Sequence, residues 1–239
     1  MMRRIAVTLG AVVLFVAAAM AMAKNFWDKP YTEWKKSEAF KMLNDSPWAQ
    51  SQTMATATGG KIEGMDRGVS GDREIYSSFV VRFFSALPIR AAYARTMQLM
   101  NNYDAKSDAE KAEIDAKFSR VLKLDFSKAI LVALEFSTND QQKKTDVMRY
   151  LDNAKVDLLK QSCYLISDRI GRVQIEEYYP PSPDGTGAKF VFPRTVNDQP
   201  VVLPTDKELK FDLWMEPVET RVFVTFKPKN MLYNGELAF

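Results

Sequence analysis

Residues 129–136 read AILVALEF, the most apolar stretch of the chain after residue 23. Only Glu135 is polar in this stretch and no Gly or Pro interrupts it, which predicts a strand with both faces buried. Residues 75–86 have the same character, since Phe79 and Val81 alternate there with Val80 and Arg82 on the other face. Because a strand buried on both faces needs neighbours on both edges, these two segments predict the centre of a β-sheet.

Further strands are expected mainly in the second half of the chain. Leu209, Phe211 and Leu213 alternate with polar residues, which is typical of a strand with one buried face. Besides the two central strands, the expected strands are residues 51–58, 163–167, 172–179, 188–192, 208–215, 221–226 and 236–239.

A short helix is expected at residues 37–44. Ser37 can accept the hydrogen bond of an N-cap, and Phe40 and Leu43 then share one face of the helix. Pro47 disfavours helical geometry in the residue before it, so the helix is expected to end before this proline.

A helical hairpin is expected between the two central strands. Pro88 suits the first turn of its first helix, in which Arg90 and Arg95 lie away from the apolar positions. Those apolar positions recur at helical spacing and are Ile89, Tyr93, Met97 and Met100. Ser107 and Glu110 have the spacing of a capping box at the start of the second helix.

Residues 145–160 predict one further amphipathic helix, in which the inward positions are Val147, Leu151, Ala154 and Leu158. Together these patterns predict an α+β fold: an antiparallel or mixed β-sheet with a helical hairpin and one further amphipathic helix packed on it. We expect the helices on one side of the sheet. No repeat or change of composition divides residues 24–239, which are therefore expected to form a single domain.

Residues 1–23 have the organisation of an export signal. Arg3 and Arg4 precede an apolar run, and the run ends in AMA at residues 21–23, where small residues fit a cleavage point. We therefore expect an exported protein that is periplasmic or extracellular after cleavage near Ala23. Alternatively, about 20 apolar residues are enough to cross a bilayer, and an uncleaved segment would tether the protein to the inner membrane. Membrane contact is expected only in that second case.

Charge and composition exclude several functional classes. Of the 33 basic residues, 31 remain without Arg3 and Arg4, against 30 acidic residues, and such a balanced charge argues against a nucleic-acid partner. The chain has no histidine, which excludes Ser-His-Asp and Cys-His catalytic centres and removes the usual nitrogen ligand of zinc, copper and haem. We expect neither a metal nor a cofactor. Cys163, the only cysteine, is interpreted as a small core residue.

Two acidic residues are candidate catalytic groups, Glu135 and Asp184. A carboxylate inside an apolar strand either takes up a proton or needs a cation nearby, and Arg82 on the neighbouring central strand is the expected cation. The alternative interpretation of Glu135 is a structural ion pair with Arg82, or a glutamate at the solvated end of the strand. Glu176 and Glu177 are adjacent on an expected strand, so they point to opposite faces and cannot form a catalytic pair with each other.

The aromatic-rich start of the chain supplies the first candidate binding residues, Trp27, Trp34 and Trp48. Exposed indole rings can stack on sugars or lie at a membrane interface. The alternative interpretation is that these rings fix an N-terminal arm to the core, because large aromatic residues commonly dominate core burial.

A proline-rich segment, residues 179–187, is expected to form the tip of a long hairpin. Tyr178, Tyr179, Asp184 and Arg194 place stacking and hydrogen-bonding groups near this tip. A surface of this kind predicts binding of a glycan or a peptide.

Several of these features resemble a group of uncharacterised exported bacterial proteins. They are Trp34, the short helix, SPWA at residues 46–49 and DGTGAKFVFPR at residues 184–194. The resemblance covers most of residues 24–239. It implies secretion and a single folded unit, and it implies no activity.

The favoured functional interpretation is a non-enzymatic binding or envelope-assembly module, whose partner is an envelope protein, a peptide or a polysaccharide. The first alternative is a carboxylate-based hydrolase that acts on glycans. The second alternative is a lipid carrier with a cavity between the sheet and the helices.

Overall fold

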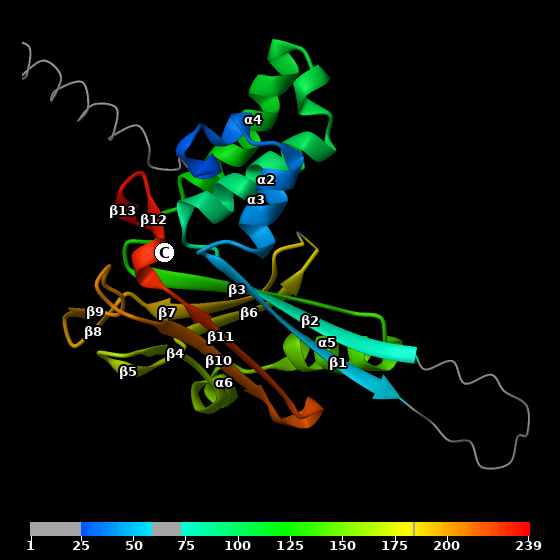
Figure 1. Cartoon of the computed structure of the whole chain (residues 1–239), viewed down its shortest axis with the longest axis vertical. Coiled ribbons are helices and arrows are strands. Elements are labelled where there is room, and N and C mark those ends of the chain that lie inside the picture. The colour runs from blue at the N-terminus through cyan, green and yellow to red at the C-terminus, as the bar shows by residue number, and fades with distance from the viewer. Residues whose placement is uncertain (1–24, 59–72, 184) are drawn as a thin grey trace, which may run out of the picture.

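Figure 1 shows a computed structural model of the chain, which describes residues 25–58, 73–183 and 185–239. The expected export signal and Asp184 therefore lie outside the described residues. The α-helices of the described part are α2 (Lys36–Asn44), α3 (Leu87–Met100), α4 (Asp108–Leu122), α5 (Gln141–Asn153) and α6 (Val156–Ser162). The longer strands are β1 (Ala49–Thr58), β2 (Arg73–Phe83), β3 (Ala129–Thr138), β4 (Cys163–Ser167), β5 (Gly171–Gln174), β6 (Glu177–Ser182), β7 (Gly187–Pro193), β10 (Leu209–Met215) and β11 (Thr220–Phe226). The two-residue strands are β8 (Thr195–Val196), β9 (Gln199–Pro200), β12 (Leu232–Tyr233) and β13 (Glu236–Leu237).

The strands form two main sheets, and every pairing in them is antiparallel. The first sheet has the order β1-β2-β3-β7-β6, and the second has the order β11-β10-β4-β5. Strand β3, which contains the most apolar stretch of the sequence, lies at the centre of the first sheet as predicted. The predicted α+β fold is thus confirmed, and its sheets are antiparallel rather than mixed.

The main core lies between the two sheets. Val132 of β3 is paired with Phe83 of β2 and with Phe190 of β7, so these three side chains share one face of the first sheet. The ring of Phe83 meets Phe226 of the second sheet with 4.7 Å between centroids, and Phe190 meets Phe211 at 5.4 Å. Large apolar side chains from both sheets therefore interdigitate in one buried cluster.

One expected strand belongs to both sheets. The alternation over residues 172–179 predicts a single strand, but β5 pairs with β4 of the second sheet and β6 pairs with β7 of the first. Between them, Ile175 is buried and the Glu176 amide donates to the Val191 carbonyl at 2.8 Å. The chain crosses from one sheet to the other at this point, and the apolar pattern continues because both sheets face the same core.

The amphipathic helix expected at residues 145–160 is also divided. Helix α5 ends at Asn153, and Ala154 has an extended backbone with φ −58° and ψ 137°. Because the break shifts the helical register, Leu159 becomes the buried residue of α6, while Leu158 is 66% exposed. The predicted inward positions in α5 are confirmed, and the predicted inward position at Leu158 is wrong.

The helices do not all lie on one side of the sheets. In Figure 1, α2, α3 and α4 gather above the sheets, whereas α6 lies below them. Helix α2 contacts β1 and β2 of the first sheet, and α6 contacts β4 and β10 of the second. The expectation that all helices cover one side is therefore wrong, because each sheet has its own helical cover.

Helix α2 begins one residue earlier than its expected cap. The residue before its first turn is Lys35, whose amide donates to the Glu38 carboxylate at 2.7 Å. Ser37 therefore lies inside the helix. The buried side chains of α2 are Ala39 and Met42 rather than the expected pair.

Two arginines of α3 are buried, although the sequence pattern places them away from the apolar positions. Arg90 donates to the carbonyl oxygens of Val121, Leu122 and Leu124 at 3.0 Å each, which satisfies the end of α4. Arg95 donates to the Trp34 carbonyl at 2.9 Å. These contacts hold the end of α4 and the N-terminal arm to α3.

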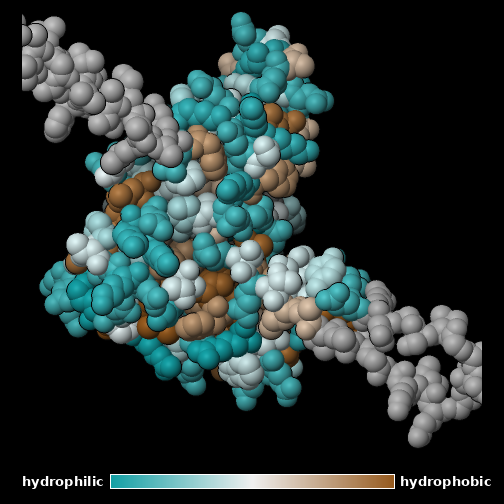
Figure 2. All heavy atoms as spheres, viewed as in Figure 1, coloured by the Kyte–Doolittle hydropathy of each residue, from teal (hydrophilic) through white to brown (hydrophobic). Residues whose placement is uncertain are grey.

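None of the helices among the described residues has both the length and the apolar composition that a membrane crossing requires. On the face drawn in Figure 2, hydrophilic residues cover most of the surface, and apolar residues show only in separate areas. The face drawn in Figure 2 thus has no single broad apolar area among its described residues.

Candidate functional site

The candidate site is a groove between α2, α3 and the outer face of the first sheet, called here the α2–α3 groove. Its volume is about 400 Å³, within the range of about 300–1,000 Å³ that is typical of small-molecule sites. Its walls are largely apolar and include Phe40, Leu43, Phe84, Ile89, Tyr93 and Met97.

Helix α3 forms one wall because its apolar residues recur on one side. Ile89, Tyr93 and Met97 follow one another at intervals of four residues, so they lie one above another on the same helix face. Met100 continues the wall at the last residue of α3 and is 66% exposed. The sequence pattern of this helix face is that of a core face, but the face lines a hollow. Solvent reaches this hollow at Met100.

The floor of the groove is the outer face of strands β2 and β3. Side chains alternate along a strand, so Phe83 points into the core and its neighbour Arg82 points to the outer face. Arg82 is paired with Ala133, and Glu135 lies two residues further along β3 on that same outer face. The floor thus consists of the small apolar residue Ala133 beside the cation of Arg82 and the anion of Glu135.

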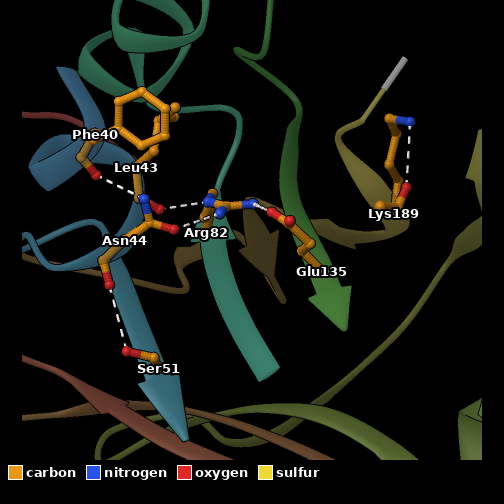
Figure 3. A network of polar contacts seen from close by, with 8 residues as sticks. Phe40, Leu43, Asn44, Ser51, Arg82, Glu135 and Lys189 are labelled. Atoms are coloured by element: carbon orange, nitrogen blue, oxygen red, sulfur yellow. Dashed lines mark hydrogen bonds and ion pairs between the residues drawn. The ribbon is translucent and has the colours of Figure 1, made fainter. Parts of the chain in front are cut away.

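The Arg82–Glu135 pair joins α2 to both central strands (Figure 3). Nη1 of Arg82 donates to Oε2 of Glu135 at 2.6 Å, and Nη2 donates to Oδ1 of Asn44 at 2.9 Å. Nε of Arg82 donates to the Leu43 carbonyl. The guanidinium is therefore held by three acceptors, two of which belong to the end of α2.

The ion pair that the sequence predicts between Arg82 and Glu135 is confirmed. The Glu135 side chain is 46% exposed and lines the groove, and Oε1 makes no hydrogen bond to any residue of the described ranges. Glu135 is the only carboxylate among the described residues that line the groove. No sequence pattern predicts the contact of Asn44 with Arg82, because nothing local to a helix end indicates a strand residue 38 positions away.

Thr96 is the polar residue of the helical wall. It lies between Tyr93 and Met97 in the groove lining, is 9% exposed, and its hydroxyl has no hydrogen-bond partner in the described part of the chain. Buried polar side chains usually have a partner, often the carbonyl one helical turn earlier for Thr in a helix. The Thr96 hydroxyl is thus a buried, unsatisfied polar group in a residue that lines the groove.

Two of the three tryptophans expected to bind a ligand are not accessible to one. Trp34 and Trp48 are fully buried. Nε1 of Trp34 donates to the Lys29 carbonyl at 3.1 Å, and Nε1 of Trp48 donates to the Ala238 carbonyl at 2.6 Å. Trp27 is half-buried and packs edge-on against Trp48 at 5.6 Å between ring centroids. These rings fix the N-terminal arm to the core, as the alternative interpretation expects, so Trp34 and Trp48 present no ring face to a ligand.

The tyrosines and the arginine expected at the hairpin tip are not brought together. Tyr178 is half-buried, and its hydroxyl donates to the Leu151 carbonyl at 2.5 Å. Tyr179 is exposed, and its hydroxyl donates to Glu177 at 2.6 Å; this hydrogen bond raises the pKa of Tyr179. The two rings lie on opposite faces of β6, as adjacent strand residues must.

Arg194 is a structural residue. It follows the last residue of β7 and donates to the carbonyl oxygens of Phe126, Ala129 and Phe239. Its guanidinium also lies 4.1 Å from the centroid of the Phe239 ring. These contacts hold Arg194 between residues 126–129 and the C-terminal segment rather than at the hairpin tip.

Cys163 is fully buried, and burial raises the pKa of its thiol well above the ordinary value. A thiol in that state is a poor nucleophile. Within the described ranges, no cluster of three or more Cys, Asp or Glu side chains has the arrangement of a metal site.

Comparison of the chain with family models, with curated proteins and with solved structures finds no match. The α2–α3 groove is therefore the feature of the described residues that bears most directly on function.

Proposed function

We propose that this protein is a non-enzymatic binding module of the cell envelope, and that it holds the apolar part of its ligand in the α2–α3 groove. The observation that carries this proposal is the combination of an apolar hollow of about 400 Å³ with a fixed ion pair in its floor. Apolar walls with a few oriented polar groups are the usual construction of a small-molecule site. The export signal expected at residues 1–23 supports the envelope as the place of action.

The groove supports the carrier interpretation more directly than a polysaccharide partner. The two fully buried tryptophans are withdrawn from any surface that a glycan could touch, whereas the groove offers mainly carbon atoms. A lipid-like or otherwise apolar ligand gains free energy by burying its surface there, at about 25 cal/mol per Å².

A glycan hydrolase is less well supported. Glycosidases use two carboxyl groups about 5–9.5 Å apart, and Glu135 has no second carboxylate beside it among the described residues that line the groove. Oε2 of Glu135 is also occupied by Arg82.

The proposal is tested with N-phenyl-1-naphthylamine, a neutral apolar probe whose fluorescence rises when it leaves water. We expect saturable binding to the purified protein. Met100→Glu replaces an apolar side chain of the groove wall and should weaken binding about tenfold, because the bound probe loses apolar contact there and must desolvate the new carboxylate.

Leu158→Glu is the matched control, because Leu158 is also 66% exposed but lines a different hollow beside α5 and α6. It should leave the affinity for the probe unchanged. Absence of saturable binding, or a loss caused by Leu158→Glu instead of Met100→Glu, would overturn the proposed function.

A further inference from the structure

The head group of the ligand can be inferred from the polar atoms of the α2–α3 groove, an argument that rests on the proposed function. Arg82 and Glu135 are the two charged residues among the described ones that line the groove, and they neutralise each other at 2.6 Å. The described lining residues therefore have no net charge to offer an ionic head group. Moving an unpaired ion into such a site costs far more than moving a neutral polar group.

The two members of this pair are not equally accessible. The Arg82 side chain is 8% exposed and makes three hydrogen bonds, whereas the Glu135 side chain is 46% exposed and uses only Oε2. Oε1 of Glu135 is thus the accessible polar atom of the groove floor. An ionised carboxylate only accepts hydrogen bonds, so this atom calls for a donor on the ligand.

Thr96 adds an independent polar contact. Its hydroxyl is buried in the groove wall without a partner in the described part of the chain, and a hydroxyl both donates and accepts. A polar ligand atom that pairs with this hydroxyl removes the cost of leaving it unsatisfied.

We propose that the ligand is a neutral amphiphile, an apolar chain or ring whose polar end carries a hydroxyl or amide N–H. The polar end donates to Oε1 of Glu135 and also contacts the Thr96 hydroxyl, and the apolar part lies along the α3 wall. Fatty-acid anions are poor ligands because their carboxylate faces that of Glu135. Alkyl ammonium ions are poor ligands because Arg82 cancels the charge that would attract them.

The test compares four ten-carbon compounds as competitors of N-phenyl-1-naphthylamine, so that the apolar part is constant: 1-decanol, 2-decanone, decanoate and decylammonium. The wild-type protein should bind 1-decanol about tenfold more tightly than each of the other three, the difference of one well-formed hydrogen bond. Equal affinities, or tighter binding of either ion, would overturn the proposal. This ranking needs no variant and so does not depend on how a variant folds.

Glu135→Gln should invert the preference between the two neutral compounds. Arg82 has only donors, so the new amide must turn its oxygen toward Arg82 and its NH₂ group into the groove. The accessible atom changes from an acceptor to a donor, and 2-decanone should then bind at least as tightly as 1-decanol. A folded Glu135→Gln protein with the wild-type order of affinities would contradict the role of Oε1.

Thr96→Val keeps the shape of the side chain and removes the hydroxyl. It should weaken 1-decanol about threefold without lowering the midpoint of thermal unfolding, because this hydroxyl has no partner in the described part of the chain. Unchanged affinity would contradict the Thr96 contact. If the naphthylamine probe itself fails to bind, the proposed function fails; if the probe binds and the head groups are not distinguished, only the present inference fails.

Discussion

Nη1 of Arg82 lies 2.6 Å from Oε2 of Glu135, yet the two side chains differ in environment, with 8% of Arg82 exposed and 46% of Glu135. The buried cation therefore depends on the half-exposed anion, whereas water can solvate the anion alone. Arg82 also binds Leu43 and Asn44 at the end of α2. One guanidinium thus joins the helix to the floor of the groove, and the stability of the groove should depend on Glu135.

Glu135→Ala should lower the free energy of unfolding by about 1–2 kcal/mol, since it removes a charge-assisted hydrogen bond from a buried arginine and solvent reduces the effect on the anion side. Denaturant unfolding followed by circular dichroism measures the difference. The matched control is Glu113→Ala, which breaks an exposed pair with Lys117 whose side chains are 71% and 69% exposed. That control should change stability by less than about 0.5 kcal/mol. Equal effects of the two substitutions would show that the Arg82–Glu135 pair behaves as an ordinary surface contact.

Trp214→Phe should remove most of the tryptophan fluorescence that iodide can quench. Trp214 is 41% exposed on β10, while Trp34 and Trp48 are fully buried. An aqueous ion collides only with rings that reach solvent. Stern–Volmer plots of the wild type and the variant measure the accessible fraction. The control is Trp27→Phe, because Trp27 is half-buried; a larger loss of quenching in this control than in Trp214→Phe would contradict the burial described for the N-terminal arm.

Ser107→Ala should destabilise the protein by about 1 kcal/mol at neutral pH, because Ser107 is the N-cap of α4. The Ser107 hydroxyl donates to Glu110 at 2.7 Å and the Ser107 amide donates to it at 3.0 Å. These hydrogen bonds lower the pKa of Glu110 from its ordinary value of 4.5 to about 2. A carboxyl group whose pKa is lower in the folded state stabilises that state above its unfolded pKa, and the contribution disappears as the pH falls toward the folded pKa.

The stability difference between the wild type and Ser107→Ala should therefore narrow between pH 5 and pH 2. Thermal unfolding across this range measures the difference. Ser119→Ala is the control, because the Ser119 hydroxyl only donates to a carbonyl within the same helix, at 2.8 Å, and alanine favours the helix interior. A difference that stays constant with pH would show that Glu110 takes no part in the cap.

Local patterns predict much of the fold. The strand expected at residues 163–167 coincides with β4, and Ser107 forms the expected capping box with Glu110. The patterns fail where the chain changes its environment without changing its hydrophobicity. At Ile175 the chain leaves one sheet for the other, and at Ala154 the helix breaks. In both places the regular spacing of apolar residues continues, so it does not mark the change of structure.

The candidate site was predicted only in part. Glu135 and its partner Arg82 follow from the rule that a carboxylate in an apolar strand needs a cation. The other half of the site comes from α3, where Tyr93 and Met97 have the spacing of core residues but line a groove. Whether a helix face meets other side chains or a hollow depends on how closely the helix approaches the sheet, which its own sequence does not encode.

The sequence by itself determined the α+β class, the central position of β3 and the pairing of Glu135 with Arg82, because strand alternation, helix caps and the cost of a buried charge act within or between neighbouring elements. Only the tertiary structure decided that Trp34 and Trp48 are buried and that α2, α3 and the first sheet enclose a groove. These features arise from contacts between segments up to 190 residues apart, such as that of Trp48 with Ala238. Long-range packing of this kind depends on the shapes of all the elements at once, so no local pattern reports it.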